Sequence, residues 1–489
     1  DKLENSPLRN ALICKPRILY ISTFIWLTAV GGRFLAPFLE HEAKLSTAQI
    51  GSCIAIQQIT ITLGSFVGGS LADSMEGRYP QSGRALVIFA GVVLSTISFL
   101  LHGVFHVLPL SIFSTTLWHQ ILQSFYGFAV SLVFPVLDGL TIEFLENHPD
   151  FNRKDYGKER LYGPLVWAFS NLILSPFLDW IGFTVCYPLA VVTTSIVGYT
   201  VFVFVRSQQQ IQDNLDDETS HTDSEVEFVA SLTIGQPVQP VSETEPNTSP
   251  LHLCSSLVLL MKILVATLYG ICFLFCLVCI SSGQAVVDNL VFLFFEALGS
   301  SWIVMGISVV IKIAFEVPVF YFGPFLLQRY GAGWVLIISC VCYFTRALSY
   351  TVIPKGHMLY VLLMEPLHGI TYGCSQIAMV DFVAESMPPG YEASGQGLIY
   401  LFKEGGGMLG VYLGGLASDL VSPKFMFQMS ALVVCIGSAT LTLGMLLSRH
   451  RIDHNILPQS ESVLASTRIV EAEMVENQEA RNEPKEHGR

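Results

Sequence analysis

The chain has 489 residues, of which 52% are hydrophobic and only 13% are charged. A soluble protein carries about 25% charged residues, so this composition excludes an ordinary soluble globular protein. Apolar sequence runs along almost the whole chain, which favours a polytopic membrane protein built of helices, because helices satisfy their backbone hydrogen bonds internally. The formal net charge of −13 comes largely from a central stretch and from the tail after Ser448. The chain begins at Asp1, and we expect its natural start to lie upstream.

The first half contains six apolar segments of about 20 residues, the length that a helix needs to cross a bilayer. We predict these spans at about residues 18–39, 49–72, 85–105, 112–144, 161–178 and 183–205. The second half repeats the plan, with spans at about residues 257–295, 302–327, 334–353, 358–383, 395–420 and 425–447. The seventh segment is so long that we expect a tilted or broken helix, with Gly283 as the break.

An acidic stretch rich in Ser, Thr and Pro separates the two halves and is too hydrophilic to be buried. We therefore predict four parts: an N-terminal six-helix bundle (residues 1–205), an acidic disordered cytosolic loop (206–256), a C-terminal six-helix bundle (257–448) and a disordered cytosolic tail (449–489).

The orientation follows from the placement of Lys and Arg, which are enriched in cytoplasmic loops. One set of alternate connections holds most of them: Lys15, Arg17, Arg78, Arg84, Arg153, Lys154, Lys158, Arg206, Lys262, Arg329, Arg449 and Arg451. The other set holds only Lys44, Lys355 and Lys424. Both termini and the central loop are therefore predicted to be cytosolic. The sequon at Asn247 would then lie in the cytosol and carry no glycan.

A short motif follows the second span. Gly69 and Asp73 close the span, and Arg78 and Arg84 come next. Small residues let helices pack closely, and a carboxylate at the membrane edge can meet an Arg or a helix N-terminus. The pattern resembles the gating loop motif of the major facilitator superfamily, and an ordinary helix end is the alternative interpretation. Its second-half counterpart, around Arg329, has no matching Asp, so we expect a weaker gate in that half.

The fifth span opens with Arg160, Gly163 and Trp167 at helical spacing, so the three share one predicted face. A guanidinium beside an indole suits a hydroxylated or carboxylated solute, through bidentate hydrogen bonds and stacking. The alternative is an Arg that extends to the membrane surface and an interfacial Trp.

This stretch makes the resemblance more specific. The chain is similar to the branch of the superfamily that contains lactose permease, phenylpropionate permease, nucleoside–proton symporters and related animal orphan carriers. Further similar segments cover most of the membrane portion, but not the central loop or the tail: residues 37–39, 45–51, 135–138, 323–331 and 365–369, with Glu316 and Arg346.

The resemblance implies roles for particular residues. Asp138, Arg160 and Trp167 match the acidic, basic and aromatic solute contacts of lactose permease. Glu316 matches a further carboxylate linked to the solute.

The resemblance also implies a proton-coupling network, which Arg346 and His368 match. The chain departs from the pattern at three positions. Thr371 stands where lactose permease has its proton-carrying carboxylate. Glu365, one turn before His368, has no acidic equivalent in lactose permease, and Arg33 is unexpected in the first span.

Charges inside spans lead to the same residues, because a buried charge normally faces a cavity or a partner. Lys312 and Glu316 are spaced i,i+4 and can pair on one helix face. Glu365 and His368 are spaced i,i+3, and His is the side chain that titrates nearest neutral pH. A static ion-pair network is the alternative to a coupling site. Asp288 either lines the same cavity as Arg33 and Lys312 or lies at the outer edge.

We predict an all-α, polytopic, twelve-span protein with the major facilitator fold, two six-helix bundles around a central cavity. The predicted function is proton-coupled symport of a small polar organic solute, a sugar or nucleoside ahead of an organic acid. We expect a monomer in the plasma membrane or an endomembrane, with no cofactor, metal, nucleic-acid partner or enzymatic activity. The alternative is a non-transporting receptor or scaffold on the same fold.

Overall fold

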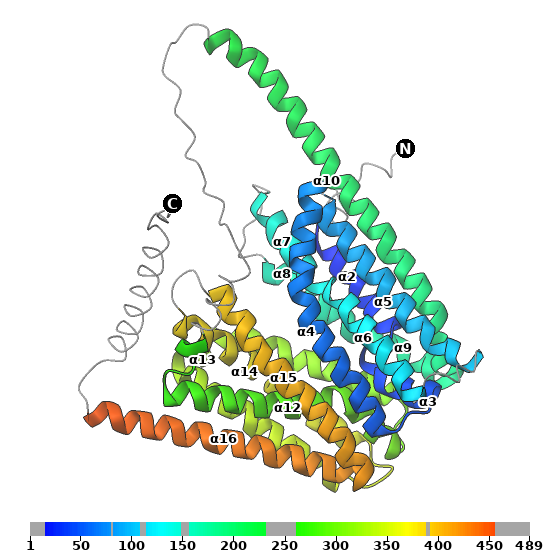
Figure 1. Cartoon of the computed structure of the whole chain (residues 1–489), viewed down its shortest axis with the longest axis vertical. Coiled ribbons are helices and arrows are strands. Elements are labelled where there is room, and N and C mark those ends of the chain that lie inside the picture. The colour runs from blue at the N-terminus through cyan, green and yellow to red at the C-terminus, as the bar shows by residue number, and fades with distance from the viewer. Residues whose placement is uncertain are drawn as a thin grey trace, which may run out of the picture. The chain divides into compact units, whose positions relative to one another are not determined.

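The computed structural model describes residues 15–79, 82–107, 114–147, 156–230, 261–387 and 392–454. Within these ranges every regular element is a helix (Figure 1), which confirms the predicted all-α class. The predicted sequon at Asn247 and most of the predicted tail lie outside the described residues.

Contacts divide the chain into two compact units. The first contains the helices before residue 231 together with Asp288–Ile313, and the second contains the remaining described residues. The helices of the N-terminal part are α2 (Arg17–Ala29), η1 (Gly32–Phe34), α3 (Leu35–Ala43), α4 (Thr47–Arg78), α5 (Gly83–Val107), α6 (Thr115–Ser131), α7 (Phe134–Asn147), α8 (Tyr156–Arg160), α9 (Tyr162–Ile181), η3 (Phe183–Val185) and α10 (Cys186–Ala230). The later helices are α12 (Leu268–Ala297), α13 (Trp302–Val352), α14 (Leu359–Ser386), α15 (Glu392–Leu420) and α16 (Pro423–His454).

Two spans of the first unit are broken helices. The first span is interrupted between α2 and α3, where Gly31 and Gly32 have φ angles of 106° and 41° that side chains rarely adopt. The fourth span is interrupted between α6 and α7, just before Pro135, which has no N–H to continue the helical ladder. Both breaks precede residues that the sequence singled out, Arg33 and Asp138.

Local capping and close packing explain how α4 is held. Ser46 and Gln49 form a capping box, in which the Gln49 N–H donates to Ser46 Oγ at 3.4 Å and the Ser46 N–H donates to Gln49 Oε1 at 2.9 Å. Gly127 of α6 lies directly against α4, because an added Cβ would meet the Gln57 carbonyl oxygen at 2.5 Å. Small residues at such contacts let helix backbones approach each other within a membrane.

Helix α13 is two helices joined at Gly331, whose φ of 77° and ψ of 161° are not helical. The part before Gly331 runs in the same direction as α14, since Val319 lies beside Gly373 and Gly323 beside Ile377.

The part after Gly331 runs in the opposite direction. Ser339 donates to the Thr371 carbonyl, and Tyr350 donates to Glu365 further back along α14. The chain therefore reverses direction at Gly331, as the predicted eighth and ninth spans require.

Two boundaries differ from those expected. Helix α12 begins at Leu268 and continues through Gly283, so Gly283 is not a break. Instead, Gly283 makes room for the Tyr343 ring, which an added Cβ would meet at 2.6 Å. Helix α10 continues past residue 205 to Ala230, because the intervening sequence contains no Pro or Gly to end it.

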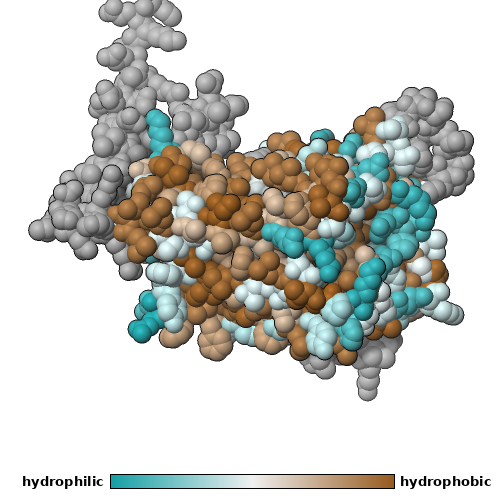
Figure 2. Space-filling model, turned by 90° about the horizontal axis from the view of Figure 1, so that it is seen from below, coloured by the Kyte–Doolittle hydropathy of each residue, from teal (hydrophilic) through white to brown (hydrophobic). Residues whose placement is uncertain are grey.

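Nine helices of the described residues are long and apolar enough to cross a membrane. One of them is α13, which Gly331 divides in two. Helices α14 and α15 are not among the nine, but they overlap the predicted tenth and eleventh spans. Hydrophobic side chains cover much of the coloured surface in Figure 2, and exposed apolar side chains include Trp180 and Leu420. This confirms a multi-pass membrane protein, and the count of twelve crossings stays a prediction.

Candidate functional site

A cavity of about 250 Å³ lies in the first unit. Residues from four predicted spans line it: Gly32, Arg33, Trp167, Asp288, Asn289, Val309 and Lys312. From the sequence, Arg33 and Lys312 were candidates for a cavity, and Asp288 either lined the same cavity or lay at the outer edge. The structure brings the three residues together at this cavity.

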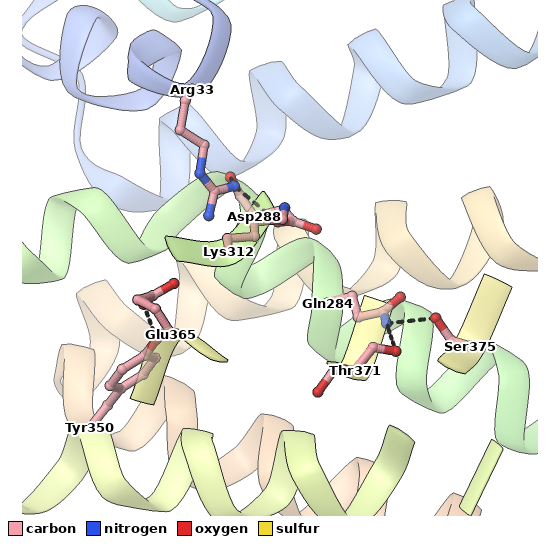
Figure 3. Close-up of polar contacts among 8 residues, drawn as sticks. All are labelled: Arg33, Gln284, Asp288, Lys312, Tyr350, Glu365, Thr371 and Ser375. Atoms are coloured by element: carbon pink, nitrogen blue, oxygen red, sulfur yellow. Dashed lines mark hydrogen bonds and ion pairs between the residues drawn. The ribbon is translucent and has the colours of Figure 1, made fainter. Parts of the chain in front are cut away.

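Asp288 is the centre of this charged cluster (Figure 3). Its Oδ1 accepts hydrogen bonds from Arg33 Nη1 and from Lys312 Nζ, each at 3.0 Å. The Arg33 guanidinium also donates to the Asp288 carbonyl oxygen and lies 5.2 Å from the centre of the Phe292 ring, a cation–π distance. Two cations and one carboxylate leave these three residues with one net positive charge.

The break in the first span places Arg33 at the cavity. Since Gly31 and Gly32 interrupt the helix, the short helix η1 carries Arg33 between α2 and α3. Discontinuous helices with freed backbone groups are typical of binding sites in membrane transporters. The signal for this break, which was not predicted, is the Gly31-Gly32 pair within an apolar segment.

Trp167 forms the aromatic wall of the cavity. Its indole packs against Gly32, where an added Cβ would meet the ring at 3.3 Å, and makes an edge contact with Phe24 at 6.1 Å between ring centres. Any side chain at position 32 would therefore press on the indole. The glycine at position 32 thus allows the helix to break and leaves room for the Trp167 indole.

Arg160 belongs to a separate cluster, although it was predicted to share a face with Trp167. Helix α8 ends at Arg160, and its Nη2 lies 3.6 Å from Asp138 Oδ2. Tyr20 donates to the other oxygen of Asp138 at 2.6 Å. The structure brings together Asp138 and Arg160, two residues predicted as solute contacts, and adds Tyr20 as a partner that the sequence did not indicate.

The predicted gating motif forms a latch on α4, α5 and α7. Arg84 lies 3.1 Å from Asp73 and pairs with Glu143 of α7, while its backbone N–H donates to Glu76 at 2.9 Å. Glu143 and Glu76 were not predicted, since neither has a sequence signal beyond being acidic at a helix end.

The other predicted gate residues take no part in this latch. Gly69 has open space beside it, and Arg78 is exposed with its guanidinium 5.9 Å from the Tyr79 ring centre. Arg329 is exposed on α13, shortly before the reversal at Gly331.

The second unit holds a buried polar cluster on α13 and α14. Tyr350 donates to Glu365 at 2.7 Å (Figure 3), and the Arg346 guanidinium lies 5.5 Å from the Tyr350 ring centre. Arg346 is only 1% exposed, and its Nε and Nη2 have no hydrogen-bond partner among the described residues. His368 is buried one turn after Glu365.

Glu316 and Thr371 also lie inside the second unit. Glu316 is buried on α13, where the following turn packs against Gly373 of α14. The Thr371 carbonyl accepts hydrogen bonds from Gln284 at 3.3 Å and from Ser339 at 2.7 Å. The contact with Gln284 is drawn in Figure 3. The backbone of position 371 thus joins three helices, and its side chain is a threonine where the resemblance would put a carboxylate.

Sequence comparisons identify relatives of the chain. The sequence model of the MFS_1 like family matches residues 18–429. The nucleoside permease NupG of Escherichia coli (strain K12) is 32% identical over 126 residues, which cover 24% of this chain and 27% of the permease. NupG of Shigella flexneri matches equally. The matched segment thus spans about a quarter of the length of these relatives.

Solved structures share the fold. Two crystal structures of the nucleoside transporter NupG have TM-scores of 0.63 and 0.61 at 16% identity, covering 88% of this chain and 98% of theirs. A POT family transporter in complex with 5-aminolevulinic acid has a TM-score of 0.57 at 11% identity, with coverage of 89% and 96%. These similarities establish the major facilitator fold.

Proposed function

Since the chain belongs to the MFS_1 like family of membrane transporters, we propose that it carries a small polar organic solute together with a proton. The transport cycle would be alternating access, in which the two halves expose a central cavity to one side of the membrane at a time. The observation that carries the proposal is the cavity at the broken first span, where Trp167 faces two cations and a carboxylate.

The cavity suits a solute with a flat ring and several hydroxyl groups. The Trp167 indole offers a stacking surface, Arg33 and Lys312 donate hydrogen bonds, and Asp288 accepts them. A nucleoside combines these features, and the matched relatives are named as nucleoside permeases. A sugar comes next, and an organic acid follows because the cluster carries one net positive charge. Asp138, Arg160 and Glu316 are proposed as further solute contacts.

The proton would bind at Glu365 or His368, with Arg346 responding to the charge of that pair. Both side chains are buried, and Tyr350 holds the Glu365 carboxyl in place. Pro366 removes one hydrogen bond from the α14 ladder next to Glu365. The missing hydrogen bond lets α14 bend at this point. A straight and a bent α14 would place Glu365 in different surroundings, so the two conformations would bind the proton with different affinities.

The test uses full-length protein in liposomes that contain a pH-sensitive dye. Nucleosides, sugars and small acids are added outside, and proton entry is recorded. Trp167→Ala should abolish the response, whereas Trp180→Ala on the same helix should keep it, because Trp180 is 84% exposed and lies outside the cavity. An equal loss in both variants would contradict the assigned solute site.

A second variant tests the coupling assignment. Glu365→Gln keeps the shape of the side chain but cannot lose a proton, so uptake of labelled solute should continue without pH dependence while solute-driven proton entry is lost. Unchanged pH dependence would remove Glu365 from the mechanism. If folded protein responds to no solute of the panel, the alternative of a non-transporting receptor gains weight.

A further inference from the structure

Three potential metal ligands meet where the first and seventh spans end. Glu40 and His41 lie on α3, Glu296 lies on α12, and their ligand atoms are all within 4.8 Å of one another. The closest pair is His41 Nε2 and Glu296 Oε1, 2.5 Å apart. All three residues belong to the first unit, and neither the solute cavity nor the proton cluster includes them.

The donor set fits a first-row divalent cation such as Zn²⁺. Zinc binds imidazole nitrogen and carboxylate oxygen at about 2.0–2.2 Å, so tetrahedral ligands lie about 3.3 Å from each other. The His41–Glu296 distance of 2.5 Å lies below that value and the 4.8 Å limit for the three atoms lies above it, so the ligand atoms are close enough to share one ion. With three protein ligands, one coordination position remains for water.

The chemistry of the cluster suits a bound cation. Glu40 and Glu296 supply two carboxylates beside the His41 imidazole, a donor set that a divalent transition metal binds. Glu296 Oε2 is inaccessible to solvent and has no hydrogen-bond partner among the described residues. A buried carboxylate oxygen without a partner is costly, and coordination of an ion would relieve that cost.

The surrounding packing keeps the ligands in place. The His41 ring contacts Phe183 and Trp302, at 5.2 Å and 5.8 Å between ring centres. Trp302 is itself fixed at the start of α13, because the Asp179 carboxylate accepts from its backbone N–H at 3.0 Å. A metal ligand held by packing loses little freedom when it binds.

The cluster is also reachable from water. The side chains of His41 and Glu296 are 41% and 29% exposed. Lys44, which directly follows α3, belongs to the connections predicted to lie outside the cytosol. An ion would therefore arrive from the external or luminal side.

We propose that Glu40, His41 and Glu296 form a binding site for Zn²⁺ or a similar divalent transition metal. A bound ion ties the end of α3 to the end of α12, and so restrains any movement that separates these two spans. The metal-free alternative is an ion pair between protonated His41 and Glu296, which the same experiment excludes or supports. The proposal does not depend on the transported solute.

The test measures metal binding directly on purified full-length protein in detergent. Zn²⁺ is titrated against a fluorescent zinc indicator, and the number of sites and their affinity are obtained. Glu296→Gln and His41→Gln should each remove one site or weaken it by more than about tenfold. The matched control is His357→Gln, an exposed histidine on the same predicted side of the membrane.

Thermal unfolding of the same samples separates binding from folding. Zn²⁺ should raise the unfolding midpoint of the unchanged protein and of His357→Gln, but not that of Glu296→Gln. Equal zinc affinity in the unchanged protein and in both site variants would overturn the proposal. Absence of zinc binding to unchanged protein with a cooperative unfolding transition would overturn it as well, and would favour the ion pair.

Discussion

The Asp288 carboxylate illustrates how a single residue controls a charged site. One oxygen accepts from both Arg33 and Lys312, whose side chains are 8% and 15% exposed. Loss of Arg33 would leave the Lys312–Asp288 ion pair, which has no net charge. Loss of Asp288 would leave two neighbouring cations without their shared acceptor. The contribution of the three residues to stability is therefore unequal.

We expect Asp288→Asn to lower the free energy of unfolding by about 1–3 kcal/mol. This is less than the roughly 3–5 kcal/mol for breaking a fully buried pair, because the Asp288 side chain is 28% exposed. Arg33→Gln should lower the free energy of unfolding by less. The variant that carries both substitutions should be more stable than the sum of the two single effects predicts. Chemical unfolding in detergent measures all three, and additive effects would show that the two residues do not interact.

The residues of the cavity could be predicted from the sequence, but their pairing could not. The cost of a charge in a membrane singled out Arg33, Asp288 and Lys312 without any structure. Spacing within one helix suggested only Glu316 as a partner for Lys312, while the recorded hydrogen bond goes to Asp288 on another helix. Tyr20 and Tyr350 had no signal at all, since a tyrosine in an apolar segment looks like packing.

At the scale of elements, Gly331 has a conformation that its neighbours in α13 do not share. Its φ of 77° and ψ of 161° lie in a region that is open essentially to glycine alone. Apart from its neighbours along the chain, no described residue would come within 4 Å of a Cβ added to Gly331. The requirement for glycine here is therefore one of backbone conformation and not of space.

Gly331→Ala should thus destabilise the protein by about 1–3 kcal/mol through backbone strain alone. Gly397→Ala is the matched control, because Gly397 lies within α15 and also has open space beside it. At that position alanine should be neutral or stabilising by roughly 0.5–1 kcal/mol. The thermal unfolding midpoints of Gly331→Ala and Gly397→Ala measure this difference. Equal shifts in the two variants would refute the explanation by backbone strain at Gly331.

The sequence predicted most helices but not their interruptions. Hydropathy located the spans because each is a long apolar segment. A glycine permits a break without requiring one, and which backbone conformation it adopts depends on the tertiary structure around it. Gly283 was expected to break a helix and instead packs against Tyr343, whereas Gly31 and Gly32 do break one.

At the scale of the whole molecule, the distribution of positive charge predicts how the chain is oriented in the membrane. Lys355 and Lys262 are both exposed, and the distribution of positive charge assigns them to opposite sides of the membrane. In intact cells a membrane-impermeant maleimide should label Lys355→Cys and should label Lys262→Cys only after permeabilisation. Protein without either substitution gives the background from native cysteines. The reverse pattern would invert the topology.

The division into domains could be predicted only in part. The polar stretch after the sixth span suggested two separate bundles, and two compact units are present. However, contacts assign Asp288–Ile313 to the first unit, although the chain order places these residues in the second half. The sequence gives the order in which the helices are connected. Which unit a helix belongs to depends on its contacts, such as the hydrogen bond between Asp288 and Arg33.

The one-residue reversal at Gly331 also bears on how the protein enters the membrane. Residues 302–330 and 332–352 are separated by no hydrophilic segment that could wait in the cytosol while the next span is synthesised. We therefore expect the two helices to insert together as a hairpin, with Arg329 keeping its tip on the cytosolic side. During biogenesis they would then behave as one unit of insertion.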